Sequence, residues 1–257
     1  MLFWKLYSSD YQDLDKRFRG IYEFIKQAGI KLDNSIILEL GPGNSCINAY
    51  HFLFKGAQRV ILVDKYPRIT NTARQESYNR SELDYVLSQY QEYQAALPGF
   101  FNAEGKPDNE HLQFFRGDIT EMGTMEKVDF IYSVSVLEHI KDVPGNIKQM
   151  AKILKPGGYM YHHIDLRDHY NFNHPFLFYK YPDWLWERLL TKEGISYTNR
   201  WRYDDLLSAF IASGLEVVEE RTQEFPVSPK LKIHERFRSC AHINIGILDI
   251  ILQKSQN

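Results

Sequence analysis

A strand, a glycine-containing turn and a helix follow one another at residues 36–56, and this segment limits the possible fold more than any other. Residues 36–40 are a short apolar run of the kind found in buried strands. Gly41 and Gly43 then allow the backbone to turn sharply and to approach a ligand closely. A second apolar run at residues 59–63 completes a β-α-β unit. The alternative interpretation of this segment is an ordinary strand-helix turn with no ligand.

The same alternation continues along the chain. Further strands are predicted at residues 112–116, 128–133, 159–164, 215–220 and 242–252, and helices at residues 143–154 and 203–213. This pattern predicts an α/β fold with a mostly parallel sheet, helices on both faces and ligands beyond the carboxyl ends of the strands. We expect one domain over residues 1–257, with a helical N-terminal extension at 1–33 and insertions at 70–109 and 166–202 that form a substrate cap.

Composition narrows the classes of partner. The formal net charge is only -2, so no basic field for a nucleic-acid backbone is present. Cys46 and Cys240 lie far apart, which argues against a disulfide framework or a cysteine-rich zinc site and favours a reducing cytoplasm. No apolar run of about 18 residues occurs, so no transmembrane segment is expected.

An acidic residue closes the second strand at the spacing that nucleoside sites use. Asp64 follows Gly43 by 21 positions, near the roughly 20 residues at which a carboxylate can bind ribose hydroxyls. A surface carboxylate at a strand end is the alternative. Glu39 would be repelled by the pyrophosphate of a dinucleotide, whereas a cationic ligand would pair with it. Cys46 also replaces the third glycine of the dinucleotide motif, so a nicotinamide-dependent oxidoreductase is less favoured.

Five ordered segments resemble the motifs of class I S-adenosylmethionine-dependent methyltransferases, which have a Rossmann-like fold. These segments are residues 37–43, 63–64, 117–119, 129–139 and 154–158. The resemblance implies a seven-stranded sheet whose last strand is antiparallel. It also implies S-adenosylmethionine as the cofactor. One departure is Ser45, which stands where many members have a third glycine.

The resemblance and the charge argument together assign candidate cofactor residues. Glu39, Gly41, Pro42, Gly43 and Asp64 are expected to hold the cofactor at the first two strands. The resemblance implies that Asp118 and Ile119 border the adenine, and that Ser133 and Val134 line the methionine end.

The end of the fifth predicted strand is rich in proton acceptors. His163, Asp165 and His169 lie there, and alternation along a strand places His163 and Asp165 on the same side. One histidine is therefore a candidate base, oriented by Asp165 as an Asp-His pair. His139, after the fourth strand, is a second candidate. These polar residues could instead tie the next loop to the core. No metal-ligand spacing accompanies them, so we expect no metal.

The second insertion is unusually aromatic. Its aromatic residues are Tyr170, Phe172, Phe176, Phe178, Tyr179, Tyr181, Trp184 and Trp186. They could form a lid for a sugar or a planar ring, or simply pack the insertion onto the domain. Weak contact with a membrane surface is a third possibility.

These features predict methylation of an oxygen atom on a small molecule or a glycan. The glycine loop is also similar to a subgroup associated with bacterial envelope or natural-product sugars, which is an analogy at the level of the fold. The alternatives are an N-methyltransferase for a small molecule and a methyltransferase-like binding module without turnover. The oligomeric state does not follow from the sequence.

Overall fold

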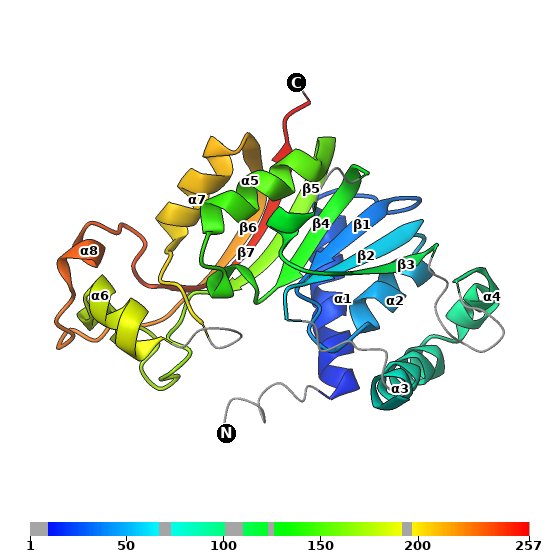
Figure 1. Ribbon diagram of the computed structural model, residues 1–257, viewed down its shortest axis with the longest axis horizontal. Coiled ribbons are helices and arrows are strands. Elements are labelled where there is room, and N and C mark those ends of the chain that lie inside the picture. Colours follow the sequence, from blue (N-terminus) through cyan, green and yellow to red (C-terminus); the bar gives the residue numbers. More distant parts are fainter. Residues whose placement is uncertain (1–9, 67–72, 101–109, 123–125, 192–196, 257) are drawn as a thin grey trace. The chain divides into compact units, whose positions relative to one another are not determined.

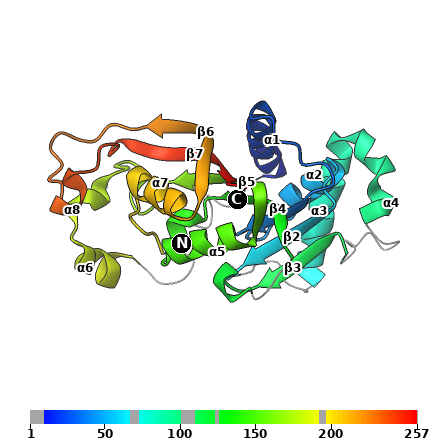
Figure 2. The same ribbon diagram turned by 90° about the horizontal axis from the view of Figure 1, so that it is seen from above.

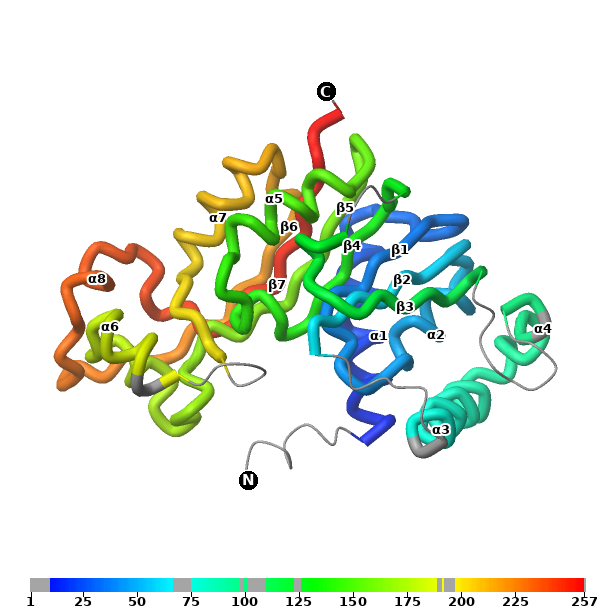
Figure 3. Tube along the Cα trace, viewed as in Figure 1, coloured from blue at the N-terminus to red at the C-terminus, as the bar shows by residue number. Residues whose placement is uncertain are grey.

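The computed structural model describes residues 10–66, 73–100, 110–122, 126–191 and 197–256 (Figures 1 and 3). Parts of both predicted insertions and of the N-terminal extension lie outside these ranges. The chain divides into two compact units. The first contains residues 1–118 and 128–130, and the second contains residues 119–127 and 131–257. Each unit is described by itself.

Seven strands form one sheet in the order β3-β2-β1-β4-β5-β7-β6. The strands are β1 (Ile36–Leu40), β2 (Arg59–Asp64), β3 (Leu112–Arg116), β4 (Val128–Val134), β5 (Leu154–Asp165), β6 (Leu215–Glu224) and β7 (Ile245–Lys254). Strands β1, β2 and β3 pair in parallel, whereas β7 is antiparallel to both β5 and β6. The predicted seven-stranded, mostly parallel sheet with an antiparallel last strand is confirmed.

Strand β5 begins earlier than the sequence pattern predicts. The expected start was residue 159, but the strand begins at Leu154. Gly157 has a φ of 73°, a left-handed conformation that glycine adopts without steric cost. The chain therefore turns at the Pro156-Gly157 step without leaving the strand. Long antiparallel pairing with β6 similarly extends β7 to Lys254.

The first unit packs three helices by their apolar faces. They are α1 (Tyr11–Gln27), α2 (Ile47–Phe54) and α3 (Ala73–Gln89), followed by η1 (Gln91–Ala95) and α4 (Leu97–Phe100). The Phe18 ring of α1 stacks on His51 of α2 at 4.6 Å and meets the Phe52 ring edge-on at 5.0 Å. Phe18, Ile21 and Ile25 are buried, as the helical spacing of the N-terminal extension predicts.

The second unit places two helices on one face of β5, β7 and β6 (Figure 2). They are α5 (Val143–Ile153) and α7 (Tyr203–Ala212). Asp142 caps α5 by accepting the Gly145 N–H at 3.0 Å, because the first N–H groups of a helix have no partner within it. His162 of β5 stacks on Phe210 of α7 at 5.7 Å, so its neighbour His163 points to the opposite face. Two short turns, η2 (Ile119–Glu121) and η3 (Leu137–His139), flank β4 in the chain.

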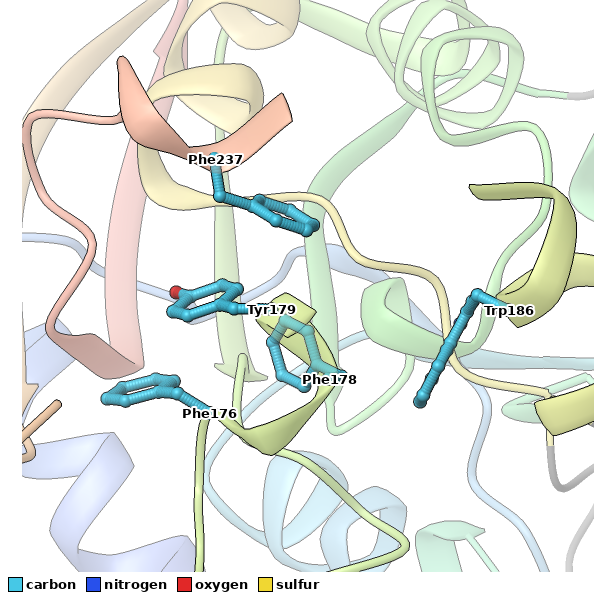
Figure 4. Close-up of a cluster of buried hydrophobic side chains, with 5 residues drawn as sticks. All are labelled: Phe176, Phe178, Tyr179, Trp186 and Phe237. Carbon is cyan, nitrogen blue, oxygen red and sulfur yellow. The ribbon is translucent and has the colours of Figure 1, made fainter. Parts of the chain in front are cut away.

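The aromatic insertion builds a small core of its own (Figure 4). Its short helices are η4 (Leu177–Lys180), α6 (Asp183–Leu185) and η5 (Trp186–Leu190), and α8 (Glu235–Arg238) joins them from later in the chain. The core consists of Phe176, Phe178, Tyr179, Trp186 and Phe237. Four of the eight aromatic residues that the sequence offered as a lid are therefore packing residues.

Only three of the insertion's aromatic side chains are exposed, namely Tyr170, Phe172 and Trp184. Trp186 is 2% exposed, so it cannot take part in the membrane contact that the sequence left open. Among the helices of the described ranges, none combines the length and the apolar character needed to cross a membrane.

Candidate cofactor and acceptor sites

The loop after β1 has the backbone conformation that its glycines predict. Gly41 has a φ of 70° and Gly43 a φ of 68°, both in the left-handed region that costs other residues about 1–2 kcal/mol. The Gly41 N–H donates to the Val63 carbonyl at 2.8 Å, which ties the loop to the end of β2. The half-buried Pro42 lies between the two turns. The loop is thus held beside the carboxyl ends of two parallel strands.

Asp64 lies against this loop, as its spacing from Gly43 predicts. Its Oδ2 accepts the Gly43 N–H at 3.1 Å and its Oδ1 accepts the Tyr66 N–H at 2.7 Å. A carboxylate oxygen can accept more than one hydrogen bond, so these contacts are compatible with ribose binding. Asp118, at the end of β3, pairs with Lys65 at 3.1 Å.

Glu39 is the most unusual carboxylate in the loop region. It is 3% exposed, and its Oε1 accepts a hydrogen bond from Asn48 Nδ2 at 2.7 Å. Its Oε2 is buried and has no hydrogen-bond partner among the described residues. Burial raises the Glu39 pKa to about 7, although the Asn48 bond lowers it. A buried carboxylate with one unsatisfied oxygen fits a nearby cation and would repel a phosphate. Asn48 was not foreseen, although it lies in the first turn of the helix after the glycine loop.

In the second unit, Ser133 makes a hydrogen bond within the protein. Its hydroxyl is fully buried and lies 2.7 Å from His162 Nδ1, so that hydroxyl is already engaged. Burial lowers the His162 pKa to about 3, which keeps this histidine neutral. Val134 is half-buried and Ile119 is buried.

His163 forms an Asp-His pair, but with a partner that the sequence did not suggest. His163 Nδ1 lies 2.8 Å from Asp249 Oδ1, and the Tyr161 hydroxyl donates to the same oxygen at 2.5 Å. Asp249 stands directly opposite His163 in the β5-β7 register. Although burial would raise its pKa, the bonds from His163 and Tyr161 hold the pKa of Asp249 below its ordinary value. The available signal was a lone acidic residue within the apolar strand β7.

Asp165 is engaged elsewhere. Its carboxylate binds Arg167 through two bonds of 2.8 and 2.7 Å, and its Oδ2 lies 3.6 Å from His169 Nε2. Burial opposes the charged forms of both groups, but these contacts lower the Asp165 pKa and raise that of His169. The buried Glu138 adds negative charge beside His169. The contact with Asp165 and the charge of Glu138 thus stabilise the protonated form of His169.

His139 lies beside this group in the second unit. Its ring is 5.0 Å from the His169 ring, and its Nδ1 is 2.6 Å from the Tyr197 carbonyl oxygen. A carbonyl can only accept, so His139 Nδ1 donates this hydrogen bond. Asn199 supports the turn by donating to the Leu137 carbonyl at 2.7 Å.

No group of three or more His, Cys, Asp or Glu side chains within the described ranges could hold a metal ion. Besides Asn48 and Asp249, the sequence interpretation also missed Glu82 of α3. The Glu82 carboxylate contacts the glycine loop.

Comparison with known families gives a match over most of the chain. A family model described as a methyltransferase domain matches residues 14–220. No curated protein matches the chain in sequence.

Solved structures share the fold at low sequence identity. An S-adenosylmethionine-dependent methyltransferase from Mesorhizobium loti has a TM-score of 0.52 and 13% identity, with 91% of this chain and 97% of that chain covered. One from Clostridium acetobutylicum has a TM-score of 0.51 and 13% identity, with coverage of 96% and 93%. The cyclase SpnF is similar at a TM-score of 0.50 and 12% identity, with coverage of 93% and 81%.

Proposed function

Because the chain belongs to the methyltransferase-domain family, we propose that it transfers the methyl group of S-adenosylmethionine to an oxygen atom of a small molecule or a glycan. One observation carries the choice of oxygen. His163 and Asp249 form an Asp-His pair in which the imidazole remains 24% exposed. A hydroxyl acceptor must lose its proton and gains from such a base, whereas a neutral amine mainly needs orientation.

The unsatisfied Glu39 oxygen supports a cationic ligand. The proposed cofactor contacts are those that the sequence indicates, namely Glu39, Gly41, Pro42, Gly43, Asp64, Asp118, Ile119, Ser133 and Val134. When bound, S-adenosylmethionine supplies a methyl group activated by its sulfonium. The protein's main task is then to hold the acceptor oxygen in line with that group, which can supply roughly 7–11 kcal/mol.

The Asp-His pair would remove the acceptor proton. Asp249 accepts a hydrogen bond from the Nδ1–H group of His163. The Nε2 lone pair can then take the hydroxyl proton while the oxygen forms its bond to the methyl carbon and the carbon-sulfur bond breaks. Asp249 then stabilises the imidazolium. This assistance is worth about 10²- to 10⁴-fold in rate.

The other three candidate residues take secondary roles in this proposal. His139 is the second candidate base, because its proton is held at Nδ1 by the Tyr197 carbonyl. Asp165, with its partner Arg167 and the nearby His169, orders the loop after β5. The exposed Phe172 ring stacks beside His169 at 6.1 Å and offers an apolar surface for an acceptor ring.

The first experiment identifies the acceptor atom. Extracts incubated with the purified protein and carbon-13-methyl S-adenosylmethionine are analysed by mass spectrometry and carbon-13 NMR. A labelled methoxy product is expected. A labelled N-methyl product would replace the oxygen acceptor by an amine. No labelled product across broad extracts would favour a binding module or another reaction, since the cyclase SpnF has this fold as well.

The second experiment tests the base. His163→Ala should lower kcat for the identified acceptor by about 10²- to 10⁴-fold without changing cofactor affinity. Asp249→Asn should lower kcat less and should shift the pH profile of kcat. His242→Ala is the matched control, because His242 Nδ1 lies 2.7 Å from Asp204 in an exposed Asp-His pair of the same unit. Full activity of His163→Ala would remove His163 as the base.

A further inference from the structure

The insertion helix α3 contacts the glycine loop through polar side chains. Gln75 Nε2 donates to the Asn44 carbonyl at 3.1 Å. About two turns further along α3, Glu82 Oε1 accepts the Ser45 hydroxyl at 2.5 Å, and Glu82 Oε2 accepts the Cys46 N–H at 2.9 Å. All of these groups belong to the first unit. The loop is therefore supported by a segment more than 30 residues away in the chain.

Burial of the Glu82 carboxylate is energetically unfavourable, and its hydrogen bonds offset this cost. It is fully buried, and a carboxylate in the interior is destabilising unless hydrogen bonds satisfy its oxygens. Here Ser45 occupies one oxygen and Cys46 the other, and the Tyr78 hydroxyl contributes a further bond. The Glu82 carboxylate therefore helps to hold the loop at Ser45 and Cys46.

Helix α2 depends on this external support at its start. Cys46 is the N-cap residue of α2 and provides no side-chain cap. Instead, Ser45 Oγ accepts the Ile47 N–H at 3.2 Å, while the Glu82 carboxylate binds Ser45 and the Cys46 N–H. A carboxylate at this place also interacts favourably with the helix dipole. Glu82 and Ser45 together do what a single N-cap side chain does in other helices.

The geometry points to Glu82 as a positioning residue that sets the affinity for the cofactor by holding the glycine loop through Ser45. Ser45 is the residue at which the loop departs from the glycine of many class I methyltransferases. Its hydroxyl gives the loop a partner in the insertion helix that glycine could not have. This inference rests on the proposed function, because it concerns the same cofactor site.

Glu82 itself is not proposed as a ligand. Both of its oxygens already bind the loop, and its side chain has no exposed surface. Glu39, by contrast, keeps an unsatisfied oxygen. Loss of Glu82 should therefore change how well the loop is ordered for the cofactor, not the chemistry of transfer.

The test uses Glu82→Gln, Ser45→Ala and the double variant of the full chain. Calorimetric titration with S-adenosylmethionine should show that each single change weakens binding by roughly ten- to hundredfold. The double variant should be no weaker than Glu82→Gln, because residues that share one bond are not additive. The KM for the cofactor should rise while kcat at saturating cofactor stays unchanged. Asp84→Asn is the matched control, since Asp84 is an exposed residue of α3 that pairs with Arg80 at 3.1 Å.

The outcomes of this test separate the possibilities. Wild-type affinity in folded Ser45→Ala and Glu82→Gln overturns the inference, as do additive losses in the double variant. A fall in kcat at saturating cofactor also overturns it, because it places Glu82 in the transfer step. If Glu82→Gln does not fold, Ser45→Ala decides, since it removes only the hydroxyl. Absence of binding by the wild type at millimolar cofactor would contradict the proposed function instead.

Discussion

Glu39 illustrates how one buried side chain can select a ligand by charge. Burial raises its pKa to about 7, so near neutral pH the carboxyl group is partly protonated. A cationic ligand binds the ionised form, so it must displace the remaining proton. The Glu39 carboxylate makes no favourable charge interaction with a phosphate. In the proposed function, Glu39 therefore favours a sulfonium cofactor and links its binding to pH.

This linkage gives a prediction at the residue scale. The affinity of the wild type for S-adenosylmethionine should rise several-fold between pH 5.5 and pH 7.5, because Glu39 ionises in this range. Glu39→Gln should bind more weakly and lose most of this rise. Calorimetry in matched buffers measures both, and comparing the two proteins at each pH cancels any titration of the ligand. An identical pH dependence in the two proteins would show that Glu39 does not face the cation.

At the scale of elements, the second insertion shows why aromatic content alone does not define a lid. Arg202 is 1% exposed, and it donates to the carbonyl oxygens of Leu166 and Ile245, each at 2.5 Å. Its guanidinium lies 5.1 Å from the centre of the Tyr179 ring and also near Phe176. A planar cation with several donors suits this combination of carbonyl groups and ring faces. The insertion therefore has a folded core around Arg202.

Arg202 should consequently matter for stability, whereas the exposed aromatic residues should not. Arg202→Lys should destabilise the protein by about 2–4 kcal/mol, because a single ammonium cannot replace both donors and the ring contacts. Trp184→Ala should change the free energy of unfolding by less than about 0.5 kcal/mol, since Trp184 is 62% exposed. Urea denaturation measures both values. Equal effects of the two changes would contradict the assigned core.

On the scale of the whole molecule, buried titratable groups oppose one another in their effect on stability. Burial raises the pKa of Glu39 and Glu82 to about 7, so their contribution is present at low pH and is lost as pH rises from about 4.5 to 7. Burial lowers the pKa of His51 to about 4 and of His162 to about 3. Their contribution is present above pH 6.5 and is lost as pH falls.

Removing one carboxyl group should disturb this balance. Relative to the wild type, Glu82→Gln should gain stability as pH rises from 5 to 7, because only the wild type then has to ionise a buried carboxyl group at position 82. Urea denaturation at several pH values, without cofactor, provides the comparison, and Asp84→Asn serves as the control. A constant difference between wild type and Glu82→Gln would show that the Glu82 pKa is not raised.

Much of the molecule followed from local sequence. Seven strands, the principal helices and the left-handed glycines were predictable because each depends on residues within a few positions of one another. The proximity of Asp64 to Gly43 was also predictable, since parallel strands bring their carboxyl ends to one edge of a sheet. The candidate cofactor residues of the first unit could be assigned on this basis.

Only the tertiary structure decided the partners of the buried polar groups. The carboxylate beside His163 is Asp249, 86 residues away, and the cap of α2 is Glu82, 36 residues from the N–H that it binds. Asp165 was the nearer choice in sequence, but Arg167 and His169 occupy it. A hydrogen bond acts over about 3 Å whatever the sequence separation. Local sequence therefore determined the fold and the glycine loop of this chain, whereas strand register and helix packing determined which charged groups become partners.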